Sequence, residues 1–141
     1  MATAPSPAFF EITVRVASVE IDEQGHVNNV VYLRWAQDAA TAHWLALAPV
    51  ELQTSVGWVA LRHEIDYKAP GFLDDELRVR TWIGTAKGLA FERHTEIVRR
   101  ADQRLLAQAR TLWCPINPET GRPKRVSAEL RALFSAAGAS R

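Results

Sequence analysis

Hydrophobic and polar residues alternate over much of the chain. Between Phe10 and Val16, four apolar residues alternate with three polar ones, and this period of two predicts a half-buried strand. The same alternation predicts four further strands, at 58–68, 77–83, 89–98 and 105–114. Turns rich in Gly, Pro and Asp separate these four strands, at 70–71, at Gly84, at Gly88 and at 101–103. Short connections favour antiparallel pairing, so the sequence predicts an antiparallel sheet.

One face of the 58–68 segment is expected to turn toward the core. On that face the alternation places Val59, Leu61, His63, Ile65 and Tyr67, and on the other face it places charged residues.

One long segment has neither the alternation nor any helix breaker. From Val30 to about Leu47 the chain contains no Gly or Pro, and two asparagines precede it. Because Asn is a preferred N-cap, the segment predicts a helix that starts near residue 29. Its polar residues form one narrow stripe, and most of the remaining circumference is apolar, so other elements must wrap this helix. The stripe consists of Arg34, Gln37, Asp38 and Thr41.

The order of elements predicts the fold class. A strand, a long helix, four strands and a short helix at about 128–134 indicate an α+β domain, in which one sheet curls around one central helix. A length of 141 residues fits a single domain. We expect residues 1–8 to be a flexible N-terminus and residues 9–141 to form that domain. A sheet with only one helix leaves two edges to cover, and oligomerisation would cover them.

Composition excludes several classes of protein. With 17 Lys and Arg against 16 Asp and Glu, the net charge of +1 leaves no electrostatic footprint for nucleic acid. No apolar stretch approaches the roughly 20 residues of a membrane helix, and the first residues lack a signal-peptide pattern, so we expect a cytoplasmic protein. The single cysteine, Cys114, excludes an internal disulfide and is expected to be a buried strand residue rather than a nucleophile. The histidines lack metal-ligand spacing and no Gly-rich phosphate loop is present, so we expect neither a metal nor a cofactor.

The segment before the predicted helix carries the candidate chemistry. Thioester hydrolysis requires a nucleophile or base, and donors aimed at the carbonyl oxygen as it gains charge. The first N–H groups of a helix have no intrahelical partner, and the helix dipole favours negative charge there. The backbone at Asn29 can therefore form an oxyanion hole. Asp22, seven residues earlier, is the candidate nucleophile or general base.

Residues 22–32 also resemble a known signature. They read Asp-Glu-Gln-Gly-His-Val-Asn-Asn-Val-Val-Tyr, and this resembles the motif of the hotdog-fold thioesterases, in particular the 4-hydroxybenzoyl-CoA thioesterase-like group. The similarity continues at 62–67, 74–77 and 120–123 and covers about residues 9–131. It implies a five-stranded antiparallel sheet around a central helix, and an acyl-CoA thioesterase. It also implies homodimers, often paired into homotetramers, with active sites at the subunit interface.

The resemblance assigns roles to particular residues. It implies that Asp22 attacks the thioester or activates water, and that His26 orients the water, donates to the carbonyl or holds Asp22. Gly25, Tyr32 and Lys87 are expected to contact the substrate, Lys87 near the pantetheine and phosphates. In the plant acyl-carrier-protein thioesterases, which the motif also resembles, Asn commonly stands where this chain has Gln24. Another hotdog subgroup uses a Glu on the helix, and the nearest carboxylate here is Asp38.

Each of these residues also has a purely structural interpretation. Asp22 could satisfy local turn amides, and the two asparagines could be caps and no more. His26 could be a loop or interface residue, and Lys87 a solvated turn lysine. Arg34 and Asp38 are spaced as an i, i+4 ion pair. The alternative functions are a hotdog-fold dehydratase or hydratase, and a non-catalytic acyl-binding module.

Overall fold

The protein is a single five-stranded antiparallel sheet with one long helix across it. In this computed structural model residues 9–139 are described, with side chains for residues 9–135, so the expected flexible N-terminus at 1–8 lies outside the described residues. The strand order is β1-β3-β4-β5-β2, and neighbouring strands pair antiparallel. This confirms the predicted sheet. Its strands are β1 (Phe10–Arg15), β2 (Gly57–Tyr67), β3 (Glu76–Lys87), β4 (Ala90–Arg99) and β5 (Arg104–Ile116).

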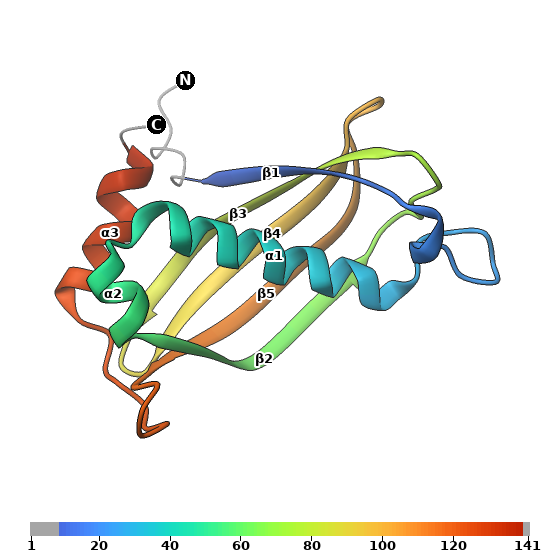
Figure 1. The fold of residues 1–141 in the computed structure, drawn as a ribbon. Coiled ribbons are helices and arrows are strands. Elements are labelled where there is room, and N and C mark those ends of the chain that lie inside the picture. The colour runs from blue at the N-terminus through green and yellow to red at the C-terminus, as the bar shows by residue number, and fades with distance from the viewer. Residues whose placement is uncertain (1–8, 140–141) are drawn as a thin grey trace.

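The long helix is α1 (Asn29–Leu47), as the sequence predicted. It lies along one face of the sheet (Figure 1). It starts at the N-cap Asn28, whose side chain accepts a hydrogen bond of 3.2 Å from the Val30 N–H. The predicted polar stripe is exposed, while Trp35, Ala39 and other apolar residues are buried against the sheet. The wrapping is incomplete within one chain, because Val30 remains 68% exposed.

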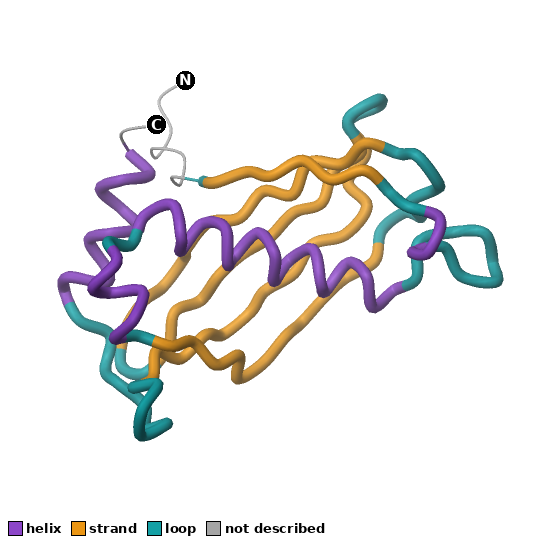
Figure 2. The backbone as a smooth tube through the Cα atoms, in the orientation of Figure 1, coloured by secondary structure: helices purple, strands orange, loops and turns teal. Residues whose placement is uncertain are grey.

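Two short helices complete one end of the molecule. α2 (Val50–Ser55) follows α1 directly, and α3 (Ala128–Ala139) closes the chain. Both lie at the C-terminal end of α1 (Figure 2). The sequence predicted α3 but not α2, nor the short 3-10 helix η1 (Ser18–Glu20). No helix among residues 9–139 is long and apolar enough to cross a membrane.

Two predictions about the strands are wrong. The pairing of β2 with β5 shifts between Ala60 and Arg62, so Leu61 is an extra residue in a bulge. Because a shift of one residue exchanges the two faces of a strand, Val59 and Leu61 are exposed and Trp58 packs into the core instead. Gly84 does not end a strand: β3 continues through it to Lys87, with an irregular register at this point.

The inner face of the sheet is divided into two apolar clusters. One surrounds Trp35 and Ile97, and the other surrounds Trp44 and Phe91. A band of buried polar side chains lies between them, because the inward-facing positions midway along the strands are polar. The band consists of Thr81, Arg93, Thr95 and Thr111, with His43 on α1.

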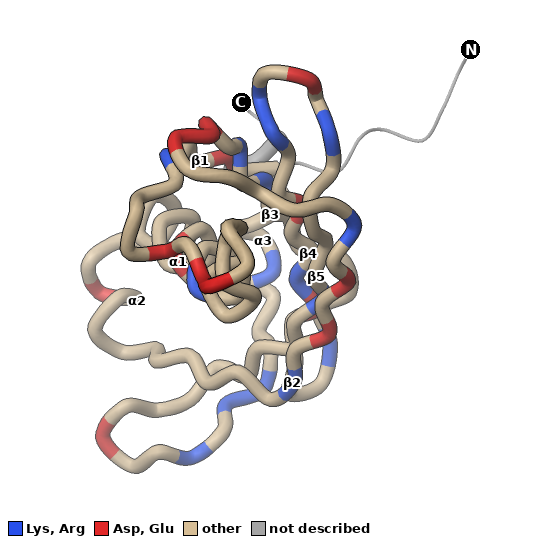
Figure 3. Tube along the Cα trace, turned by 90° about the vertical axis from the view of Figure 1, so that its right-hand side faces the viewer, with Lys and Arg blue, Asp and Glu red and all other residues tan. Residues whose placement is uncertain are grey.

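Charged residues are interspersed on the surface. Figure 3 shows acidic and basic positions mixed along the trace. Nine ion pairs of Arg with Asp or Glu join described residues, for example Arg80 with Glu11 at 2.7 Å and Arg100 with Glu76 at 2.9 Å. Exposed pairs of this kind contribute little to stability, typically about 0–1 kcal/mol each.

Candidate active site

The segment before α1 folds back on itself as a small hairpin. The Asp22 N–H donates to the His26 carbonyl at 2.8 Å, and a bridge joins Ile21 to Val27. Gly25 has a φ of +86° at the turn, a conformation that favours glycine. Residues that face each other across an antiparallel pair project from the same side. The fold therefore places Asp22 opposite His26, on the side away from the buried Val27.

Glu20 anchors this hairpin to α1. Its carboxylate is buried, accepts a hydrogen bond of 2.8 Å from the Ala17 N–H and forms an ion pair with Arg34 of α1. The expected pair of Arg34 with Asp38 is therefore wrong. A carboxylate distant in sequence reaches Arg34, and Asp38 stays exposed on the polar stripe.

The Asp22 carboxylate has both a structural contact and a free oxygen. Its Oδ1 accepts a hydrogen bond of 2.8 Å from the Gln24 N–H, which is the turn contact that the structural interpretation requires. No described residue donates to its Oδ2. The turn contact fixes the carboxylate at the surface of the loop and leaves one oxygen available.

The N-terminus of α1 presents an unpaired amide. The Asn28 side chain caps the Val30 N–H, and the Asn28 carbonyl accepts from the Val31 N–H at 2.9 Å. The Asn29 N–H has no hydrogen-bond partner among residues 9–139. This amide lies in the positive end of the helix dipole, so it can donate to a developing oxyanion. The Tyr67 hydroxyl donates to the Asn29 carbonyl at 3.0 Å and ties this turn to β2.

A hollow of about 250 Å³ lies beside the helix start. His26 enters it from the hairpin and stands edge-on to the Phe72 ring, with 5.9 Å between ring centroids. Asp22 does not line the hollow. His26, which lies opposite Asp22 in the hairpin, does. The lining residues are His26, Val27, Asn29, Tyr32, Tyr67, Lys68, Ala69 and Pro70.

Tyr32 supports the wall of the hollow from the buried side. Its ring is 2% exposed, and its hydroxyl accepts a hydrogen bond of 2.9 Å from the Gly71 N–H. Burial raises the pKa of this phenol. The Gly71 carbonyl in turn accepts from the Val27 N–H at 2.9 Å. A Cβ on Gly71 would lie 3.1 Å from Val27 and 3.2 Å from the Tyr32 oxygen, so any other residue here would require these neighbours to move by a few tenths of an ångström.

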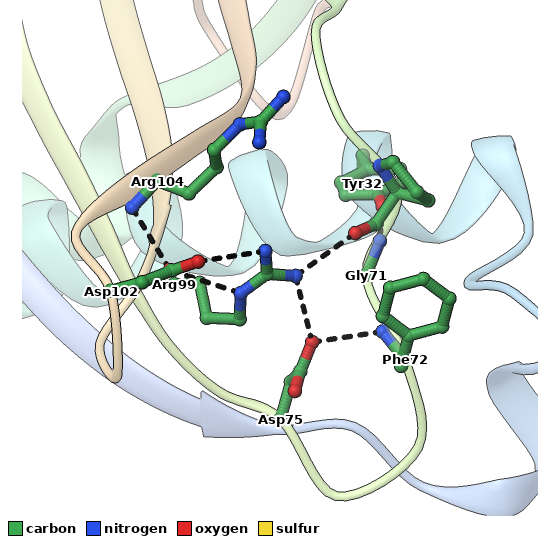
Figure 4. A network of polar contacts seen from close by, with 8 residues as sticks. Tyr32, Gly71, Phe72, Asp75, Arg99, Asp102 and Arg104 are labelled. Carbon is green, nitrogen blue, oxygen red and sulfur yellow. Dashed lines mark hydrogen bonds and ion pairs between the residues drawn. The ribbon is translucent and has the colours of Figure 1, made fainter.

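Arg99 also fixes this wall, through the backbone of Pro70. Its guanidinium donates to the Pro70 carbonyl at 3.1 Å and to Asp75 at 3.3 Å, and pairs with both oxygens of Asp102 at 3.0 Å. Asp75 also accepts from the Phe72 N–H at 2.9 Å. Figure 4 shows Arg99 between these two carboxylates. The hydrogen bonds to Asp102 and Asp75 raise the pKa of Arg99. The bonds of Arg99 to Pro70 and of Asp75 to Phe72 fix the loop that faces His26.

Lys87 is not near this hollow within one chain. It is exposed at the end of β3, in the turn where Val126 N–H donates to the Gly88 carbonyl at 2.8 Å. That turn lies beside α3, at the opposite end of the sheet from the start of α1 (Figure 1). Its contact with substrate stays a prediction.

Some residues of the hollow were not expected from the sequence. The strand pattern placed Tyr67 on the inner face of β2, but nothing indicated its bond to Asn29. Nothing in the sequence placed Lys68 at the hollow or Phe72 against His26, because both positions depend on how the loop after β2 folds. Cys114 is buried, as predicted, and burial raises the pKa of its thiol. No three His, Cys, Asp or Glu side chains gather as a metal-ligand set in the described part of the chain.

The five-stranded antiparallel sheet wrapped on one long helix defines a hotdog fold. The family model of the thioesterase-like superfamily matches residues 16–134, and the chain belongs to this superfamily. This places it among the thioester hydrolases. No curated protein sequence matches the chain.

Solved structures support the fold. A 4-hydroxybenzoyl-CoA thioesterase, solved in complex with 4-hydroxybenzoyl-CoA, is 19% identical, with a TM-score of 0.83 over 91% of this chain and 99% of that one. The 1,4-dihydroxy-2-naphthoyl-CoA thioesterase from Synechocystis is 20% identical, with a TM-score of 0.76 over 89% and 95%. The Dynemicin thioesterase, whose structures concern polyene binding, is 26% identical, with a TM-score of 0.80 over 91% and 96%.

Proposed function

We propose that the protein hydrolyses acyl-CoA thioesters to a free carboxylate and a free thiol at the N-terminus of α1. The observation that carries this proposal is the unpaired Asn29 amide beside a hollow that His26 enters, with Asp22 across the hairpin from His26. The two similar thioesterases named for CoA substrates support CoA as the thiol.

In this proposal the Asn29 N–H donates to the thioester carbonyl oxygen. A fixed donor of this kind stabilises the negative charge that develops on this oxygen when the carbonyl carbon is attacked. The cap at Asn28 and the bond from Tyr67 keep the amide in place. Donation from the backbone needs no particular side chain at residue 29.

Asp22 supplies the attack in one of two ways. Its carboxylate either adds to the carbonyl carbon and expels the thiolate, leaving an anhydride for water to open, or it takes a proton from water that adds directly. Its Oδ2 is the oxygen without a partner in the described residues, so we assign the reaction to that atom. His26, opposite Asp22, orients the water or donates to the carbonyl.

The complete site is expected at a subunit interface, as the family resemblance implies. The outer edge of β2 is one of the two sheet edges, and it exposes Val59, Leu61 and Tyr67. An exposed apolar strand edge pairs readily with another chain. Pairing there would add a second wall to the hollow, since Tyr67 and Asn29 lie at this edge.

The test is thiol release from a panel of acyl-CoAs by wild-type protein and by Asp22→Asn. Loss of acid–base help costs about 10²–10⁴-fold, so we expect kcat to fall at least about a hundredfold. Glu23→Gln is the matched control, because it removes the neighbouring, exposed carboxylate. An unchanged kcat in Asp22→Asn would refute the role of Asp22. A wild-type protein that releases no thiol would favour an acyl-binding module, and conversion of an enoyl-CoA without thiol release would favour a hydratase.

A further inference from the structure

A second, larger cavity lies between α1 and the sheet. Its volume is about 640 Å³, which is within the range of small-molecule sites. Exposed residues of the α1 polar stripe lie at its mouth, and buried residues of β4 and α3 lie at its inner end. The lining residues are Gln37, Asp38, Ala40, Thr41, Trp44, Trp58, Val59, Ala60, Ile83, Phe91, Arg93, Trp113 and Phe134.

Arg93 is an unusual residue for the inner end of such a cavity. It is 4% exposed, and its Nη1 donates to Thr81 Oγ1 at 2.8 Å and to His43 Nδ1 at 3.0 Å. Its guanidinium lies 5.6 Å from the centre of the Phe134 ring. No carboxylate of the described residues lies within ion-pair distance of it. A buried cation without an anion is costly.

The neighbours of Arg93 do not compensate its charge. Burial lowers the pKa of His43 to about 3, so this histidine is neutral and serves as an acceptor. Burial also lowers the pKa of Arg93 to about 10, and the guanidinium therefore remains charged at neutral pH. Asp38 is the one acidic residue among the described lining residues, and it lies at the exposed mouth.

Residues that line the cavity also carry buried hydrogen-bond donors without partners. Four buried side-chain nitrogens lack a partner among the described residues, and three of them belong to cavity residues: Arg93 Nε, Trp58 Nε1 and Trp113 Nε1. Buried donors of this kind normally have acceptors. Arg93 therefore lacks both an anion and an acceptor for its Nε within the described residues.

We propose that this cavity binds the acyl group of the substrate and that Arg93 pairs with a carboxylate at the far end of that group. The substrate class is then a thioester of a dicarboxylic acid, with an apolar chain between the two ends. The identification of the ligand as an acyl group rests on the proposed function; the carboxylate site does not.

The distance along α1 from Asn29 to the cavity sets the length of the acyl chain to be tested. Thr41 marks the cavity, because it is one of the lining residues. Asn29 and Thr41, twelve residues apart, are separated by about 18 Å along the axis of α1. An extended carbon chain covers roughly 1.2 Å per bond, so a chain of about sixteen carbons spans this distance. Hexadecanedioyl-CoA and hexadecanoyl-CoA are therefore the matched substrates, because they differ only at the far end.

The carboxylate site is tested first by binding alone. Trp44, Trp58 and Trp113 line the cavity, so tryptophan fluorescence reports occupancy by octanoate or by octanol. Charge-assisted hydrogen bonds are stronger than neutral ones, so we expect octanoate to bind wild-type protein at least about tenfold more tightly than octanol. In Arg93→Met this preference should disappear. Arg80→Met is the control, because Arg80 lies on the neighbouring strand, pairs with Glu11 and does not line the cavity.

The outcomes separate the two proposals. Equal binding of octanoate and octanol to wild-type protein overturns the carboxylate site, whether or not Arg93→Met folds. Preferred binding of octanoate without thiol release from any acyl-CoA supports the site and refutes the thioesterase. Preferred binding together with equal kcat/KM for the two sixteen-carbon substrates overturns the assignment of the cavity to the acyl group. The proposal is supported when hexadecanedioyl-CoA has the higher kcat/KM and Arg93→Met removes the difference.

Discussion

Tyr32→Phe removes one oxygen atom from beneath the wall of the hollow. That oxygen accepts the hydrogen bond from the Gly71 N–H at 2.9 Å, and Gly71 is buried. Water replaces a buried acceptor only where there is space for it, and a Cβ on Gly71 would already have three neighbouring atoms within 3.3 Å. The substitution therefore leaves a backbone donor unpaired, which costs about 1–3 kcal/mol.

This loss is large enough to measure by thermal unfolding. For a chain of 141 residues, a change of 1 kcal/mol shifts the Tm by roughly 3–4 °C, so Tyr32→Phe should lower the Tm by roughly 3–12 °C. We expect kcat/KM for acyl-CoA to fall as well, because the Gly71 carbonyl also accepts from Val27, next to His26.

Tyr67→Phe is the matched control for this prediction. It also removes a hydroxyl that bonds to backbone, but Tyr67 is 45% exposed, so water can take the place of the lost donor. The free energy of unfolding should change by less than about 1 kcal/mol. The reasoning fails if the two variants unfold at the same temperature, or if Tyr67→Phe is the less stable of the two.

Two further predictions concern α1. Asn28→Ala removes the cap of the Val30 N–H and should cost about 0.5–2 kcal/mol of stability in urea unfolding, with a lower kcat, whereas Asn28→Asp keeps the acceptor and should retain both. Because burial lowers the pKa of His43 to about 3, the unfolded chain takes up a proton below about pH 6.5 that the folded chain does not, and stability is lost as the pH falls. His43→Gln should therefore lose roughly 2 kcal/mol less than wild type between pH 7 and pH 4.5 in unfolding measured at both values; an equal loss would contradict a neutral buried histidine.

The long helix could be predicted because its signals are local. An asparagine cap and the absence of Gly and Pro over the following residues are readable from neighbouring positions, and α1 begins at Asn29 as expected. The same is true of the strands, whose alternation is visible within a few residues. α2 was missed because six residues carry too little periodicity.

The faces of β2 could not be predicted, because a bulge leaves no local signal. The extra residue at Leu61 exchanges the two faces for everything before it. His63, Ile65 and Tyr67 keep their predicted face, whereas Trp58 takes the place expected for Val59. The alternation alone is compatible with either arrangement.

The candidate site was predicted as a motif but not as a set of contacts. The segment 22–29 is continuous in sequence, so its residues were bound to be neighbours. The groups that fix it come from elsewhere in the chain: Glu20 reaches Arg34, Tyr67 reaches Asn29, and Arg99 holds the loop around Gly71. Such pairings depend on the packing of the strands, and a single sequence does not contain them.

The band of polar residues in the core bears on what the cavity is for. Stability alone favours apolar side chains under α1, since each buried polar group must find a partner to offset its desolvation. Thr81 and His43 meet this condition through Arg93, but Arg93 itself keeps an unpaired Nε and its charge. The packing of α1 on the sheet gains no stability from a buried, unpaired guanidinium. An anionic ligand is the simplest group that pairs with it. In that case octanoate should raise the Tm of wild-type protein more than octanol does at the same concentration, and this difference should disappear in Arg93→Met.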